Sequence, residues 1–185
     1  TNVWENVKDA SNDFTTFDVG RAYLYANEYD ATVSFVGEIN GESERCYLSR
    51  TDDVRLPGFH LIGNPFTHNI YKGAGAAIDN NNLVTGYYTL SNSGGWEANM
   101  SEDNPIAPCQ GILVKTMTAG EIVINKTNKA SSRRSDDMSI LSFKVANKEY
   151  EDKTYVVFED DYGLEKINHQ NEDIPMIYVT VEDSD

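Results

Sequence analysis

Hydrophobic and polar residues alternate along much of the chain, and helical spacing of apolar residues is almost absent. The alternation is clearest in short segments at residues 20–26, 32–36, 59–62 and 84–90. Alternation at every second position places successive side chains on opposite faces of a strand. No window of a dozen residues repeats apolar positions at helical spacing without an interrupting Gly, Pro or Asn. The pattern therefore predicts a chain of short β-strands.

The second half of the chain continues this pattern. Residues 111–115 and 121–125 are predicted to form a hairpin around Thr118-Ala-Gly120, and further strands are predicted at 141–145, 155–158 and 176–181. Many short strands separated by turn residues predict an all-β fold, a jelly-roll-like or Ig-like β-sandwich with very little helix.

A polar stretch at residues 126–137 divides the chain. We expect a main β-sandwich module over residues 1–128. A smaller β unit over residues 136–185 either packs on that module or begins a second β domain. The chain stops soon after a predicted strand, so we also expect it to be a truncated piece of a longer protein.

Composition and charge narrow the classes of partner. The 185 residues include 30 acidic and 15 basic side chains, for a formal net charge of -15. Such a chain repels nucleic acid and anionic membrane surfaces, whose binding depends largely on Lys and Arg. It also contains no apolar run long enough to span a bilayer. Surplus carboxylates leave calcium as the one cofactor to consider.

Four phrases occur in an order that resembles a known module. They are GRAYLYA at 20–26 with VSFVG at 33–37, GFHLIGNPF at 58–66, PIAPCQGILV at 105–114, and DKTYVVF at 152–158 with GLEK at 163–166. Together they resemble the C-terminal β-module of Bacteroidetes cell-surface and secreted proteins, many of them adhesin-like or exported by type IX secretion. The resemblance implies an exported protein at the outer-membrane surface or outside the cell, and it brings no established catalytic residues. His60 and Ile112 depart from the pattern, which usually has Asn and an aromatic residue there.

The residues within these phrases have structural explanations. Pro65 fixes its own φ and favours an extended Asn64, whose side chain can hydrogen-bond a neighbouring loop. Pro108 and Gly111 frame a turn that leads into the strand at 112–114. We interpret Asn64, Pro65, Pro108, Cys109 and Gly111 as structural residues.

The two cysteines, Cys46 and Cys109, could form one disulfide in an oxidising compartment, or each could be a small buried hydrophobic residue. Cysteine catalysis would need His60 or His68 beside Cys109. Cys109 lies in a Pro-rich turn of an acidic chain, which argues against a reactive thiolate. No zinc-ligand spacing is present. We therefore expect no catalytic residues.

Two clusters of oxygen donors are candidate calcium sites: Asp79 with Asn81, and Asp160 with Asp161. Hard cations prefer such ligands. The alternative is that Asx-rich turns simply reverse the chain, and neither cluster has EF-hand spacing.

Trp96, with Tyr87 and Tyr88 on a nearby strand, is the candidate aromatic platform for a carbohydrate. The alternative is that Trp96 packs in the core or covers a hairpin. Tyr87 and Tyr88 must point to opposite faces of their strand, so only one of them can share a face with a platform.

We interpret the chain as a non-enzymatic, extracellular structural or adhesive module of a bacterial surface protein. Its expected partners are other domains of that protein, and a glycan or host surface protein is a further candidate. The alternative is a carbohydrate-binding module attached to a secreted glycan-degrading protein.

Overall fold

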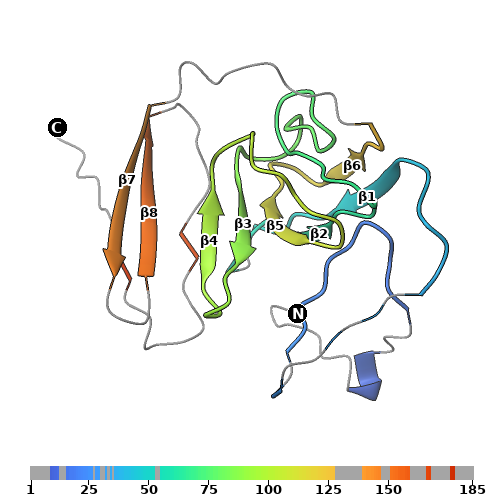
Figure 1. Cartoon of the computed structure of the whole chain (residues 1–185). Coiled ribbons are helices and arrows are strands. Elements are labelled where there is room, and N and C mark those ends of the chain that lie inside the picture. The colour runs from blue at the N-terminus through green and yellow to red at the C-terminus, as the bar shows by residue number, and fades with distance from the viewer. Residues whose placement is uncertain are drawn as a thin grey trace.

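The computed structural model describes residues 9–12, 16–26, 28–29, 32, 34, 36–52, 55–127, 139–146, 151–158, 166–167 and 176–177. Within them the protein is all-β, as predicted, apart from one turn of 3-10 helix at Ala10–Asn12. Its strands form three antiparallel sheets (Figure 1). They are β1 (Glu44–Leu48), β2 (Phe59–Gly63), β3 (Tyr87–Leu90), β4 (Trp96–Asn99), β5 (Gly111–Lys115), β6 (Gly120–Ile124), β7 (Ser139–Ala146) and β8 (Glu151–Phe158).

The largest sheet has four strands in the order β2-β5-β3-β4. Its central strand β5 is buried from Ile112 to Lys115, because β2 and β3 flank it and both faces of the sheet are covered. Ile112 and Val114 enter the main core, whereas Leu113 enters a second core with Tyr88 and Trp96. The run of apolar residues in β5 thus follows from burial on both faces.

A two-stranded sheet of β1 and β6 completes the main core. Cys46 and Leu48 from β1 pack with Ile122 and Ile124 from β6 in the main core cluster. A bridge between Ile78 and Ile124 joins this sheet to the connection between β2 and β3. Each large aliphatic side chain buried here contributes about 1.5–3 kcal/mol relative to an exposed one.

The N-terminal segment covers one edge of the four-stranded sheet. Arg21 forms an antiparallel bridge with Ile62, and the Gly63 amide donates to the Gly20 carbonyl at 2.9 Å. A covered edge has fewer unpaired main-chain groups that another chain could bind. Of the strand predicted at 20–26, only this bridge at Arg21 forms. Of the strand predicted at 32–36, the described residues 32, 34 and 36 belong to no strand, and residues 33 and 35 lie outside the described residues.

The predicted hairpin between residues 111–115 and 121–125 is wrong. The two strands form, but β5 pairs with β2 and β3, whereas β6 pairs with β1. The chain changes sheets between Lys115 and Gly120 because Thr116 is held by the β2 side of the fold, where its amide donates to Gly58 O at 2.8 Å. A change of sheet at a bend is typical of β-sandwiches.

The β7–β8 hairpin lies beside β4 (Figure 1), and β8 contacts that strand. Two short segments, residues 166–167 and 176–177, bind to this hairpin through Asp152. The buried Asp152 carboxylate pairs with Lys166 Nζ, and its Oδ2 accepts a hydrogen bond from the Ile177 amide at 2.7 Å. Ile167 then packs in the second core against Trp96. The division into a body at 1–128 and a unit at 136–185 stays a prediction, and within the described residues the later segments pack on the earlier ones.

Candidate functional site

The aromatic residues predicted to form a carbohydrate platform are buried. Trp96, Tyr87 and Tyr88 are 8%, 2% and 4% exposed. Tyr87 lies in the main core, and the other two lie in the second core on the opposite face of the sheet. The platform prediction for these three residues is therefore wrong, because both faces of β3 are covered. Trp96 instead packs in the core, as the alternative interpretation of the sequence predicted.

The Tyr87 hydroxyl has its own polar partners inside the fold. It accepts a hydrogen bond from Asn99 Nδ2 at 2.9 Å and donates to the Asn104 carbonyl at 3.3 Å. Burial raises the pKa of Tyr87 to about 12. The phenol therefore stays protonated and holds the loop after β4.

The first calcium candidate is an Asx turn. The Asp79 carboxylate accepts hydrogen bonds from the Asn81 amide at 3.0 Å and the Gly75 amide at 2.9 Å. Each of its oxygens thus stabilises a main-chain reversal. Among the described residues, no three His, Cys, Asp or Glu side chains come close enough to hold a metal ion. The second candidate, Asp160 with Asp161, lies outside the described residues.

Asn64 locks the corner after β2. Its side-chain amide donates to the carbonyls of His68 at 2.8 Å and Ile106 at 2.9 Å, and its Oδ1 accepts from the Phe66 amide at 2.9 Å. Pro65 lies within this corner, between Asn64 and Phe66. Asn64 is buried, and every polar group of its side chain is used.

The second phrase also forms a turn. The Gln110 amide donates to Ala107 O at 3.0 Å across Pro108 and Cys109, and Cys109 has a φ of 61°. These features describe a type II turn, with Pro in its second position and a left-handed residue in its third. At the strand entry, a Cβ on Gly111 would lie 2.7 Å from the Ala22 Cβ. Glycine at 111 therefore lets the N-terminal segment approach.

The two cysteines are free and differ in environment. Cys46 is buried in the main core, where burial raises the pKa of its thiol, whereas Cys109 is exposed. They do not form the disulfide that the sequence allowed. The histidines considered beside Cys109 contact main-chain carbonyls instead. His60 Nε2 lies 2.6 Å from Ser49 O, and His68 Nε2 lies 3.1 Å from Lys126 O.

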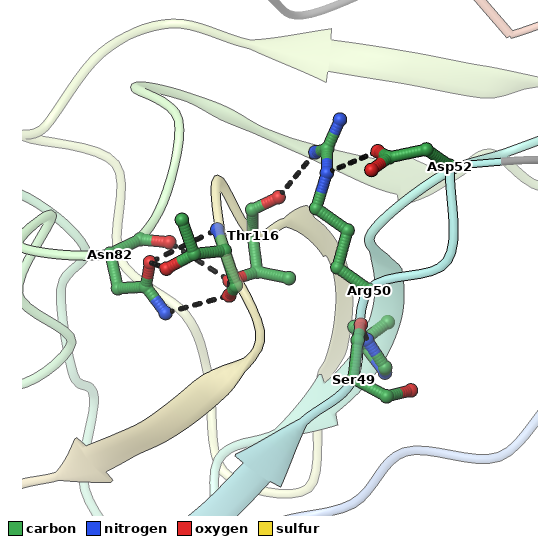
Figure 2. A network of polar contacts seen from close by, with 7 residues as sticks. Ser49, Arg50, Asp52, Asn82 and Thr116 are labelled. Atoms are coloured by element: carbon green, nitrogen blue, oxygen red, sulfur yellow. Dashed lines mark hydrogen bonds and ion pairs between the residues drawn. The ribbon is translucent and has the colours of Figure 1, made fainter.

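A second polar corner joins the sheets at Thr116 (Figure 2). The Arg50 guanidinium donates to Thr116 O at 2.9 Å and to Asp52 Oδ1 at 2.7 Å. On the other side, the Thr116 hydroxyl lies 3.0 Å from Asn82 O. Gly58, with a φ of 76°, fits here because a Cβ would lie 2.5 Å from Thr116 O. Most polar groups of this network thus bind main-chain atoms and fix the path of the chain at this corner.

A small cavity lies between β4 and β8. Its volume is about 50 Å³, and residues of both strands line it, among them Trp96, Asp152 and Tyr155. Small-molecule pockets typically measure about 300–1,000 Å³. This cavity therefore holds no more than a few water molecules.

Exposed apolar side chains concentrate in the N-terminal part of the described chain. Of the thirteen large hydrophobic residues that are exposed among the described residues, nine lie between residues 16 and 48, and we call them the N-terminal apolar surface. They are Phe17, Val19, Tyr23, Leu24, Tyr25, Tyr29, Val36, Ile39 and Tyr47. The Phe17 and Tyr23 rings stack edge to face with centroids 4.8 Å apart. None of the residues predicted to bind a ligand or a metal lies in this region.

A buried lysine was also missed. Lys72 is 3% exposed, and its Nζ donates to Asn80 Oδ1 at 2.6 Å and to Val84 O at 2.8 Å. The Asn80 side-chain amide in turn donates to Glu102 Oε1 at 3.1 Å. Lys72 and Asn80 lie on the long connection between β2 and β3, and Glu102 lies on the loop after β4.

Burial lowers the pKa of Lys72 to about 7, although the nearby Glu102 and Asp79 carboxylates act in the opposite direction. Lysines are almost never fully buried unless they are paired, so this one is a candidate for chemistry. The nearest signal in the sequence is the small-residue run at 73–77. At Gly73 a Cβ would lie 2.5 Å from the Glu102 Cδ, so the absence of a side chain leaves room for that carboxylate.

Comparison of the chain with protein-family models, curated proteins and solved structures finds no match. The part of the chain that the structure describes contains no helix with the length and hydropathy of a membrane-spanning segment.

Proposed function

We propose that the chain is a non-enzymatic structural or adhesive module of an exported bacterial surface protein. The observation that carries the proposal is the N-terminal apolar surface. Exposed apolar side chains concentrated in one part of a chain are candidates for contacts with another protein, and two of these, Phe17 and Tyr23, are in ring contact. The polar residues at the corners, by contrast, are engaged in holding the fold, and the cavity between β4 and β8 is too small for a substrate.

The partner that fits this surface best is another folded domain of the same surface protein. Tyr side chains contribute large contact areas at low entropic cost, and Tyr25, Tyr29 and Tyr47 are 66%, 73% and 62% exposed. The net charge of -15 keeps such a module soluble while its contact surface stays apolar.

Hydrogen exchange tests this proposal. The amides of residues 16–48 should exchange more slowly in the full-length surface protein than in the isolated chain, and Tyr25→Ser with Tyr29→Ser should abolish that difference. Tyr155→Ser, in the cavity next to β4, serves as the control at a distance from this surface. Equal exchange in the two proteins would contradict the proposal, as would turnover of a glycan or peptide by the purified chain.

Carbohydrate binding remains the second candidate, now at a different place. The exposed Tyr25, Tyr29 and Tyr47 rings could stack on sugar faces, whereas the buried Trp96 could not. A glycan array that gives hits lost on Tyr25→Ala and Tyr47→Ala would favour this candidate. An array without hits would leave the structural or adhesive module as the function.

A further inference from the structure

Lys72, Asn80 and Glu102 bring together an amine, a carboxamide and a carboxylate in one hydrogen-bonded chain. The amine nitrogen lies 2.6 Å from the Asn80 carbonyl oxygen, and the nitrogen of the same carboxamide lies 3.1 Å from Glu102 Oε1. The amine is thus next to the carbonyl carbon, and the carboxylate is next to the nitrogen that would leave. Amide exchange between two side chains requires this order of groups.

The amine meets the first requirement for a nucleophile, because it is neutral in a large share of molecules at neutral pH. Burial lowers the pKa of Lys72 to about 7 against the opposing effect of the Glu102 and Asp79 carboxylates. Desolvated lysines become nucleophilic for this reason. An ordinary exposed lysine is almost entirely protonated at the same pH.

Main-chain groups hold the carboxylate and the amine in place. Glu102 Oε1 also accepts a hydrogen bond from the Ala74 amide at 3.2 Å, and the missing side chain of Gly73 makes room for it. Lys72 Nζ donates a hydrogen bond to Val84 O at 2.8 Å, which orients the amine. Asp79 is held by the Gly75 and Asn81 amides, so Glu102 is the carboxylate in contact with the carboxamide. Fixed orientation of this kind lowers the barrier to an intramolecular reaction.

We propose that Lys72 and Asn80 join through an intramolecular amide bond, formed by the folded protein itself with Glu102 as the proton carrier. The neutral Lys72 amine attacks Asn80 Cγ, and a new bond forms between Nζ and Cγ. Glu102 takes one proton from Nζ and passes it to Asn80 Nδ2. The bond between Cγ and Nδ2 then breaks, and one molecule of ammonia leaves. No oxidant, reductant or other reactant is consumed.

The bond removes the free-energy cost of burying a charged amine. An amide has no charge to desolvate, and its N–H can still donate to a nearby carbonyl such as Val84 O. It also closes a covalent ring across the connection between β2 and β3. The proposal goes beyond the function proposed above and does not depend on it, because ring closure is independent of what the N-terminal apolar surface contacts.

Mass spectrometry of the purified protein tests the bond. The intact mass should be lower than the sequence mass by one ammonia. Trypsin should fail to cleave after Lys72, so peptide 56–115 should appear in place of peptides 56–72 and 73–115. A protein of full sequence mass that yields the two separate peptides after long incubation at about pH 8 would overturn the proposal.

Three variants separate the bond from other losses of ammonia. Lys72→Arg keeps the positive charge but cannot form the amide, and Glu102→Gln keeps the shape but cannot carry the proton. Both should have the full sequence mass and be cleaved after residue 72. Asn81→Ser, a matched change at the exposed neighbouring position, should retain the bond. Circular dichroism confirms folding of each variant.

The variants also expose the competing explanation, in which Lys72 is only a buried cation that satisfies carbonyl groups. Loss of ammonia that persists in Lys72→Arg would come from cyclisation of an asparagine with the main chain, and it would refute the bond. A bond that forms at an unchanged rate in Glu102→Gln would refute the role of Glu102.

Discussion

Cys109 has a φ of 61°, a conformation in which the Cβ of an L-residue crowds its own main chain. The turn needs this conformation to bring Gln110 back onto Ala107 and Asn64, so the side chain is accommodated rather than required. The Tyr87 hydroxyl shows the opposite case, because its two hydrogen bonds in the fold depend on that one side chain. Single residues in this protein therefore differ in how much their side chains contribute to the stability of the fold.

Cys109→Gly should be tolerated and should change the free energy of unfolding by less than about 1 kcal/mol, because relief of the left-handed strain offsets the larger entropy of an unfolded glycine. Cys109→Val should destabilise the fold, since a β-branched residue fits this conformation poorly. Urea denaturation measures both changes. A strong loss of stability in Cys109→Gly would show that the thiol has a role of its own.

Tyr87 predicts how stability changes at high pH. Its pKa rises from about 10 in the unfolded chain to about 12 in the fold, so its contribution is fully present below pH 10 and is lost as the pH rises from 10 to 12. Denaturation midpoints across this range should fall less steeply in Tyr87→Phe than in the unchanged protein. Tyr25→Phe, at a position that is 66% exposed, serves as the control substitution.

At the scale of elements, the corners and the ion pair keep the sheets together. Asn64 and Thr116 hold main chain where the strands end, and the contact between Asp152 and Lys166 fastens later segments to β8. Such contacts stabilise the fold only when every buried polar group has its partner, because a group that loses its partner keeps its desolvation cost.

Asp152→Asn should destabilise the protein by about 2–4 kcal/mol, because it removes the charge that pairs with the largely buried Lys166. Lys166→Met should also destabilise it, by leaving the Asp152 carboxylate without this cation. The double variant should lose less than the sum of the two single losses. Additive losses in chemical denaturation would show that the pair is not coupled.

The positions of several strands could be predicted from the local sequence. The pairing of those strands into sheets could not. Alternation identified the segments that become β2, β5 and β6, yet β5 and β6 do not pair, because the bend at Thr116 sends them to different sheets. The alternation alone also missed β1, in which two charged residues are followed by Cys, Tyr and Leu without alternation. Pairing depends on contacts between distant segments, which periodicity does not contain.

The candidate site was less predictable than the fold. The buried position of Trp96 depends on Ile167, which lies far away in the sequence and covers the second face of the sheet. Lys72 looks like an ordinary loop lysine until Asn80 and Glu102 fold against it. Asn64 could be anticipated because Pro65 restricts the main chain on either side of their shared peptide bond.

On the scale of the whole molecule, the second core links the four-stranded sheet to a segment in the C-terminal part of the described chain. Tyr88, Trp96 and Leu113 come from the four-stranded sheet, and Ile167 comes from a segment after β8. A shared core implies that these parts unfold together rather than as independent domains.

Ile167→Ala should lower the free energy of unfolding of the whole chain by about 2–4 kcal/mol and shift the fluorescence of Trp96 to longer wavelength, because the cavity admits water beside the indole. The measurement is best made with Trp4→Phe, which leaves Trp96 as the one tryptophan. An unchanged unfolding transition monitored at Trp96 would show that the segment after β8 stabilises only itself.

The proposed bond between Lys72 and Asn80 joins residues eight positions apart, and this has a mechanical consequence for the proposed module. A stretched chain gains about 3.3–3.6 Å per residue, so a covalent ring between these residues withholds on the order of 20 Å from the unfolded contour. When such a module is pulled apart, the ring stays closed after the sheets have separated. With the proposed bond in place, the unfolded chain would therefore be shorter than its residue count implies.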